Sequence, residues 1–350
     1  MSSKEEVINK KKLSGKQKYD RILDIIFAIL QVVAIVIIYF LIKGVIKLRE
    51  NLMQLNPSYQ MPQITDLKIT IIFLGIIFPF KIVFESFFIH IGSKIMLDKY
   101  QNPKTKEDEE MAKILPGKIA RHFYKIFMYL IFVVAAFFIL RDYDYFPKYL
   151  GGHGQLKNMY LPGYPNAYYI KRTKEFNYLY LSSLATAIID FFSLISVYGK
   201  QIDFKNMLLH HTCTVSLILS SYLTNYSNAG SIVLFVHNIS DLPNHITKLF
   251  LKIKVPKIFC NIAGILFMLS FIYFRIFAFS QVIFTIYYYV TWKWSWVTYS
   301  IEILLLFLLI MNINWTSILI YKFIGLLRNI EITDNVEIKL DSNKKDKKRE

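Results

Sequence analysis

The sequence predicts an all-α, polytopic integral membrane protein with about eight transmembrane helices. Of its 350 residues, 54% are hydrophobic and 16% are aromatic, and the mean hydropathy of +0.37 is too high for an ordinary soluble enzyme. The apolar residues gather in runs long enough to cross a bilayer as helices. The formal net charge of +17 comes largely from basic residues in the tails and short loops. This distribution is typical of the cytosolic segments of membrane proteins, and it argues against a nucleic-acid-binding protein.

The apolar runs give the order of the predicted spans. They cover residues 22–42, 69–95, 123–140, 176–198, two segments between 203 and 248, 258–290 and 296–327. Because eight is an even number, both basic tails lie on one side, which the positive-inside rule makes cytosolic. The tyrosine-rich stretch 141–175 is then a lumenal loop on the membrane interface. We expect four regions: a basic cytosolic tail at 1–21, a first span and loop at 22–68, the main membrane domain at 69–327 and a charged cytosolic tail at 328–350.

The segment from Asp203 to Lys248 places ionisable groups inside two predicted spans. His210 and His211 lie in the first, and His237 and Asp241 lie in the second. An ionisable side chain at membrane depth costs at least about 2.5–3.5 kcal/mol, so these groups indicate a function. On a helix, His237 and Asp241 share a face, and we expect the carboxylate to hydrogen-bond the imidazole and orient it. Imidazoles and a carboxylate in an apolar site are suited to general-base or nucleophilic acyl transfer.

Two acidic residues in other spans are also candidates. Asp190 lies within the span 176–198, where it either serves the site or pairs with a Ser, Thr or Tyr of a neighbouring helix. Glu85 follows Lys81 by four residues, so it either pairs with that lysine at the interface or contributes to the site.

A metal site is a competing use of the histidines and the aspartate of the 203–248 segment. The spacing matches no tetrahedral ligand pattern, and we expect no bound metal. Cys213 and Cys260 both lie in apolar runs and predict neither a disulfide framework nor a cysteine-based zinc site. The remaining histidines are expected to be structural: His90, His122, His153 and His245.

The run HHTCTVSLILSSYLTNYSNAGSIVLFVHNISDLPNHITK resembles the Lag motif of ceramide synthases, a branch of the TLC-domain family. The two agree without gaps in the double histidine, the S-Y-x-x-N run, the glycine and the second histidine with an aspartate four residues later. The resemblance implies a TLC-domain helical barrel core with catalytic residues His210, His211, His237 and Asp241. Substrate-binding candidates are Asp190, Ser221, Tyr222, Asn225, Asn238, Lys248 and Arg275, the last of which matches an arginine in the family's penultimate span.

The sequence departs from the family pattern at three positions. Asn238 stands where the family has a first aspartate, so it keeps hydrogen bonding and loses the charge. His245 replaces a usually acidic residue, and Asn312 replaces a common histidine. Together, the resemblance covers roughly Lys81, in KIVFESFF, to Lys322.

The resemblance implies an N-acyltransferase that joins a fatty acyl-CoA to the amine of a sphingoid base, giving (dihydro)ceramide. No cofactor is expected beyond the acyl-CoA co-substrate. A histidine acts either as general base or as a nucleophile that is acylated first, and both versions stay open. The alternative is a non-catalytic TLC-domain protein that binds, senses or transports lipid.

The expected partners are acyl-CoA, a sphingoid base, the lipid bilayer and a second subunit in a homo- or heterodimer. The resemblance implies the endoplasmic reticulum membrane, and Lys347 and Lys348 resemble a dilysine retrieval signal. Lysines on the cytosolic loops could bind the phosphates of CoA: Lys200, Lys205, Lys248, Lys252, Lys254 and Lys257.

Overall fold

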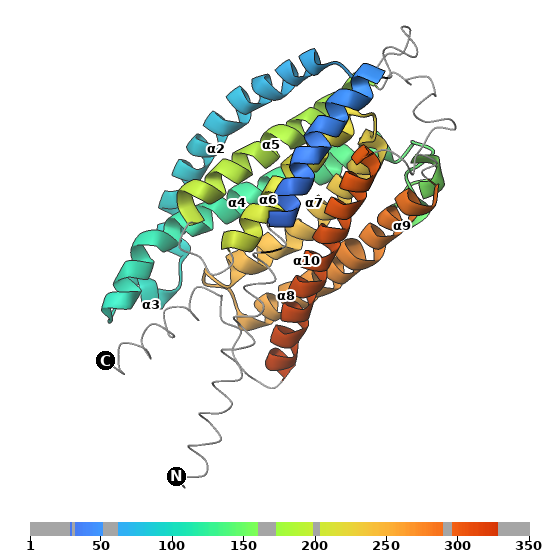
Figure 1. Cartoon of the computed structure of the whole chain (residues 1–350). Coiled ribbons are helices and arrows are strands. Elements are labelled where there is room, and N and C mark those ends of the chain that lie inside the picture. Colours follow the sequence, from blue (N-terminus) through green and yellow to red (C-terminus); the bar gives the residue numbers. More distant parts are fainter. Residues whose placement is uncertain are drawn as a thin grey trace, which may run out of the picture.

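The computed structural model describes residues 29, 32–51, 62–159, 173–198, 204–289 and 296–327. This part of the chain is mainly helical and contains no β-strand, which confirms the all-α fold class (Figure 1). Short elements connect the long helices: η1 (Ile64–Asp66), α3 (Asp98–Gln101), η2 (Lys148–Leu150) and η3 (Leu156–Met159). The long helical segments are 32–51, α2 (Leu67–Ile95), α4 (Lys106–Leu140), α5 (Lys174–Tyr198), α6 (Phe204–Leu223), α7 (Ser227–Phe250), the continuous run of α8 (Lys257–Phe271), η4 (Ile272–Ala278) and α9 (Phe279–Tyr289), and α10 (Trp296–Leu327).

Several helices are long and apolar enough to cross a membrane, as expected for a polytopic membrane protein. Within the described ranges there are five: Ile64–Ile95, Asp108–Leu140, Lys174–Ile195, Lys257–Tyr289 and Trp296–Ile324. Helices α6 and α7, with 20 and 24 residues, are also long enough. Their polar motif makes them less apolar than the other five. The first expected span, 22–42, lies only partly within the described residues, so the predicted number of eight is matched approximately.

Helix α4 begins at Lys106, well before the apolar run at 123–140. The Thr105 hydroxyl caps it by accepting a hydrogen bond from the Asp108 N–H (3.1 Å). The following residues include glutamate, lysine, alanine and methionine, which favour helix, and the helix accommodates Pro116. Much of the charged segment before the apolar run is therefore a polar extension of the transmembrane helix.

Helices α6 and α7 form an antiparallel pair joined by a short turn. Helix α7 packs against α4 and α8, while α6 packs against α5 and α10 (Figure 1). Helix α2 packs on α4 and α5, and its outer face exposes large apolar side chains such as Ile71 and Val83. This arrangement keeps the polar motif of α6 and α7 inside the bundle and presents apolar surface to lipid.

The helix at 32–51 lies against the start of α10. The rings of Phe40 and Trp296 stack with centroids 6.4 Å apart, and Gly44 faces Val297 so closely that an added Cβ would lie 2.9 Å from its Cγ2. Arg49 reaches the α6–α7 turn, where its Nη1 donates to the Leu223 carbonyl (2.7 Å). The helix at 32–51 is thus packed against α10.

The aromatic loop after α4 packs inward. Tyr145 and Phe146 are buried, the Phe146 ring meets Phe235 of α7 edge to face at 5.2 Å, and the Tyr145 hydroxyl lies 3.3 Å from Ser231 Oγ. We expected this loop to lie on the membrane interface. Its described part, 141–159, covers the end of the bundle where α7 begins, because its large rings find apolar partners there. Residues 160–172 lie outside the described residues.

Candidate active site

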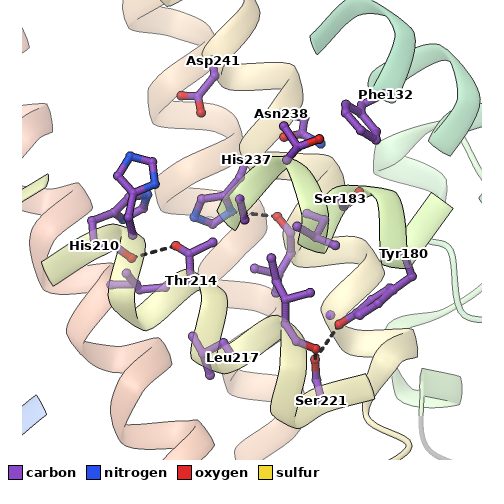
Figure 2. A pocket seen from close by; sticks show the side chains of 18 of the residues that line it. Phe132, Tyr180, Ser183, His210, Thr214, Leu217, Ser221, His237, Asn238 and Asp241 are labelled. Carbon is purple, nitrogen blue, oxygen red and sulfur yellow. Dashed lines mark hydrogen bonds between the residues drawn. The ribbon is translucent and has the colours of Figure 1, made fainter. Parts of the chain in front are cut away.

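A cavity lies inside the bundle between α4, α5, α6, α7, η4, α9 and α10. It holds about 1140 Å³ of atom-free space, its open mouth included, which is large for a small-molecule site, where about 300–1,000 Å³ is usual. Charged and imidazole side chains gather toward one end, and apolar side chains form most of the remaining wall (Figure 2). Eight of the eleven predicted site residues line it: Asp190, His210, His211, Ser221, His237, Asn238, Asp241 and Arg275.

His237 is held by its own helix. Its Nδ1 lies 2.7 Å from the Val233 carbonyl oxygen. A carbonyl oxygen only accepts, so Nδ1 carries the proton and donates. The other ring nitrogen, Nε2, is buried and has no hydrogen-bond partner within the described residues. In the neutral ring, Nε2 therefore holds the lone pair that can act as a base or nucleophile.

Asp241 does not make the expected hydrogen bond to His237. Its Oδ1 accepts instead from Arg275 Nη2 at 2.5 Å. Arg275 is 3% exposed, and its Nε also donates to Ser240 Oγ (2.7 Å). A guanidinium offers five donors and a full charge, so it outcompetes a neutral imidazole for the carboxylate. The expectation that Asp241 orients His237 is wrong, and the Val233 carbonyl takes that role.

The π-helical segment η4 carries Arg275 to this position. Its wider turn, Ile272–Ala278, interrupts the run from α8 to α9 in the wall of the cavity. Such π-helical insertions occur frequently at functional sites. Arg275 Nη1 also lies 3.4 Å from the Asn312 Oδ1 of α10, so one side chain links α7, η4 and α10.

The adjacent histidines of α6 point in different directions. The rings of His210 and His211 are 5.5 Å apart and nearly perpendicular. His210 also meets the Trp315 ring of α10 edge to face at 5.4 Å, and its Nδ1 is buried without a hydrogen-bond partner in the described part of the chain. His211 lines the cavity together with Asp190 and Lys125. Each imidazole thus faces a different part of the cavity.

A second ion pair lines the cavity between α4 and α5. Lys125 Nζ contacts Asp190 Oδ2, and the Asp190 side chain is 10% exposed. Asp190 pairs with a lysine rather than with the neutral side chain that we considered. Farther out, Lys81 and Glu85 form the expected pair (3.8 Å), and Lys81 also donates to Ser193 Oγ (2.6 Å). Lys81 and Glu85 do not line the cavity.

Hydroxyl groups mark the opposite end of the cavity. Tyr180 Oη lies 2.5 Å from Ser221 Oγ (Figure 2). Gly230 of α7 approaches this pair so closely that an added Cβ would lie 2.1 Å from Tyr180 Oη. Nearby, the Tyr226 hydroxyl lies 3.1 Å from Thr298 Oγ1. The glycine of the motif is therefore required by close packing at this end.

The arrangement suits chemistry on a long apolar molecule. Two imidazole nitrogens, His210 Nδ1 and His237 Nε2, have no partner among the described residues, and both rings belong to the cavity wall. An apolar chain can occupy the rest of the cavity while its polar end meets these rings. In the described ranges, no group of three or more His, Cys, Asp and Glu side chains is placed to hold a metal ion.

The family model described as the TLC domain matches residues 118–321. This match covers more than half of the chain and contains every catalytic candidate. The chain belongs to the TLC-domain family. The match starts in α4 and ends in α10, so the family region includes all the helices that line the cavity.

This TLC domain is similar to several ceramide synthases over limited segments. It is 30% identical to ceramide synthase LOH1 of Arabidopsis thaliana over 123 residues, which are 35% of this chain and 36% of that protein. It is 33% identical to ceramide synthase 4 of Bos taurus over 90 residues, 25% of this chain and 23% of that one. It is 52% identical to human ceramide synthase 1 over 48 residues, 14% of each chain. The matched segments thus span about a third or less of these relatives.

Three predicted site residues of this TLC domain lie outside the cavity wall. Tyr222 is buried and donates from its hydroxyl to Asp66 Oδ2 (3.1 Å). Asn225 occupies the α6–α7 turn with a φ of 63°, in the left-handed region that asparagine tolerates better than most residues. Lys248 lies in the last turn of α7. The first two positions support the fold around the site.

Several cavity residues of the TLC domain were missed by sequence reasoning. Lys125, Tyr129, Tyr180 and Thr214 line the cavity, and Trp315 contacts His210. Lys125 could have been predicted from the sequence. Placing a lysine inside the predicted span 123–140 costs about as much free energy as placing Asp190 inside the span 176–198. The tyrosines and the tryptophan carry no such signal in an aromatic-rich sequence.

Proposed function

We propose that the protein is an N-acyltransferase that joins a fatty acyl-CoA to the amine of a sphingoid base, giving (dihydro)ceramide. The observation that carries the proposal is the gathering of His210, His211 and His237 on one largely apolar cavity. The similarity to ceramide synthases supports the choice of substrates.

The reaction balances with these groups alone. The amine nitrogen attacks the thioester carbonyl carbon, the N–C bond forms and the C–S bond breaks. One proton of the amine passes to an imidazole and then to the departing CoA sulfur, so no oxidant or reductant is consumed.

Two routes use the imidazoles differently. In the general-base route, His237 Nε2 takes the proton of the amine, because its Nδ1 is already committed to the Val233 carbonyl. In the covalent route, His210 or His211 is acylated first and the amine then attacks the acyl-imidazole. Arg275 supports either route by neutralising Asp241 in the same wall.

We further propose that the protein resides in the endoplasmic reticulum membrane with both termini cytosolic. In this orientation the imidazole end of the cavity faces the cytosolic supply of acyl-CoA. His210 follows the start of α6 at Phe204 by six residues, which is about 9 Å of helix. Two lysines expected to bind CoA phosphates are already engaged: Lys254 pairs with Asp98 (2.5 Å), and Lys252 Nζ donates to the Lys248 carbonyl (3.3 Å). A phosphate would have to replace these contacts.

The test is ceramide formation by the purified protein. A panel of fatty acyl-CoAs is supplied with dihydrosphingosine, and the product is measured by mass spectrometry. The His210→Ala/His211→Ala variant is expected to make none at equal expression. The matched control is His90→Ala/His153→Ala, which removes two histidines away from the cavity and is expected to retain activity.

The same preparations distinguish the routes. Acyl-CoA alone should increase the intact mass by one acyl group in the covalent route and leave the mass unchanged in the general-base route. A folded wild-type protein that binds acyl-CoA but makes no ceramide with any chain length would overturn the proposal and favour a lipid-binding role.

A further inference from the structure

One carboxylate oxygen of Asp190 has no hydrogen-bond donor among the described residues. Lys125 occupies Oδ2, while Oδ1 is buried and has no hydrogen-bond partner in the part of the chain that the structure describes. The residue belongs to the cavity wall, and its side chain is nine-tenths buried. A buried acceptor without a donor is unfavourable. A ligand donor at this point would therefore be stabilised.

The charges of the cavity indicate the type of donor. Lys125 neutralises Asp190, and Arg275 neutralises Asp241. A second cation at Asp190 would be repelled by Lys125. A neutral hydroxyl adds no charge and donates one hydrogen bond, so it fits this oxygen better than an ammonium does.

The position of Asp190 relates this donor to the imidazoles. His211, Asp190 and Lys125 all line the same cavity. A molecule that places a hydroxyl on Asp190 can place a neighbouring atom near the α6 histidines. Sphingoid bases carry hydroxyl groups beside the amine, so their headgroup has this shape.

We propose that Asp190 Oδ1 accepts a hydrogen bond from a headgroup hydroxyl of the sphingoid base and so positions the amine at the histidines. Lys125 holds the carboxylate in place through its other oxygen. This inference rests on the proposed function and names the residue that distinguishes a hydroxylated base from a simple long-chain amine.

The experiment compares dihydrosphingosine with a 2-aminoalkane of equal length that lacks both hydroxyl groups. The kcat/KM of each is measured for the wild type and for Lys125→Met/Asp190→Ala. Replacing both partners leaves no unpaired buried charge, so this variant is expected to fold. The matched control, Lys81→Met/Glu85→Ala, removes an ion pair at similar depth outside the cavity.

The wild type and the control should prefer dihydrosphingosine about ten-fold or more, as expected for a hydroxyl bound by a carboxylate. The Lys125→Met/Asp190→Ala variant should use both amines with similar kcat/KM. A preference that persists in this variant, or that is absent from the wild type, would overturn the inference.

A binding measurement separates this inference from the proposed function. If the wild type makes no ceramide, the proposed function fails, but thermal unfolding with each amine still tests Asp190. Greater stabilisation by dihydrosphingosine in the wild type, lost in Lys125→Met/Asp190→Ala, would support the hydroxyl site. Equal stabilisation by the two amines would overturn it.

Discussion

Arg275 and Asp241 form an ion pair between the π-helical segment η4 and helix α7, with 2.5 Å between Nη2 and Oδ1. The same guanidinium donates to Ser240 Oγ. If α7 and η4 separated, the buried guanidinium would lose its carboxylate partner, which is energetically costly. This contact fixes the wall that also presents His237.

The Arg275→Met substitution should destabilise the protein. It leaves Asp241 without its cation, and breaking a buried pair in this way costs about 3–5 kcal/mol. Thermal unfolding in detergent should show a midpoint several degrees lower than that of the wild type. The Arg275→Met/Asp241→Asn variant should recover most of the loss, because it has no unpaired charge. An unchanged midpoint for the single variant would show that the pair contributes little.

The His237→Asn substitution isolates the role of Nε2. The asparagine amide can still donate to the Val233 carbonyl in place of Nδ1, so stability should change little. In the general-base route, ceramide formation should fall by about 10²–10⁴-fold, the usual contribution of a positioned base. Full activity in this variant would show that Nε2 takes no part in proton transfer.

The Gly230→Ala substitution should strain the hydroxyl end of the cavity. Its Cβ would overlap Tyr180 Oη, and Tyr180 is only 2% exposed, with its ring stacked on Phe176 and Tyr222. Overpacking of this kind costs about 1–3 kcal/mol. Thermal unfolding measures the loss. The Tyr180→Phe change removes the clashing oxygen, so Gly230→Ala/Tyr180→Phe should be more stable than Gly230→Ala; an equal or lower midpoint would refute the clash.

Substitutions of Asn225 test whether it serves the turn or the substrate. With a φ of 63°, Asn225→Gly should be about 1 kcal/mol more stable than Asn225→Ala, because the left-handed conformation is unfavourable for residues with a Cβ. Both proteins, once folded, should make ceramide at similar rates. A raised KM for the sphingoid base in the glycine variant would instead indicate contact with the substrate.

The sequence was sufficient to predict the helical membrane fold and much of the site. Ionisable groups stand out in apolar runs, and a short turn makes α6 and α7 neighbours, so His210, His211 and His237 could be assigned to one cavity. The Lys81–Glu85 pair was also predictable, because its two residues are one helical turn apart.

Pairings between distant helices were not predictable. Asp241 had a histidine four residues away, but packing brought Arg275 to it from η4. Packing of α4 against α5 likewise brought Lys125 to Asp190. Local spacing shows which partners are possible, whereas tertiary packing decides between them. The inward packing of Tyr145 and Phe146 likewise depends on an apolar surface that α7 supplies.

His210 and Ser221 stand toward the two ends of the cavity on a single helix. The two residues are eleven positions apart in the sequence, which corresponds to about 16.5 Å at 1.5 Å per residue. Because His210 and Ser221 both belong to α6, the distance between them stays constant when neighbouring helices shift. The spacing between the imidazole end and the hydroxyl end of the cavity is therefore set by a single helix.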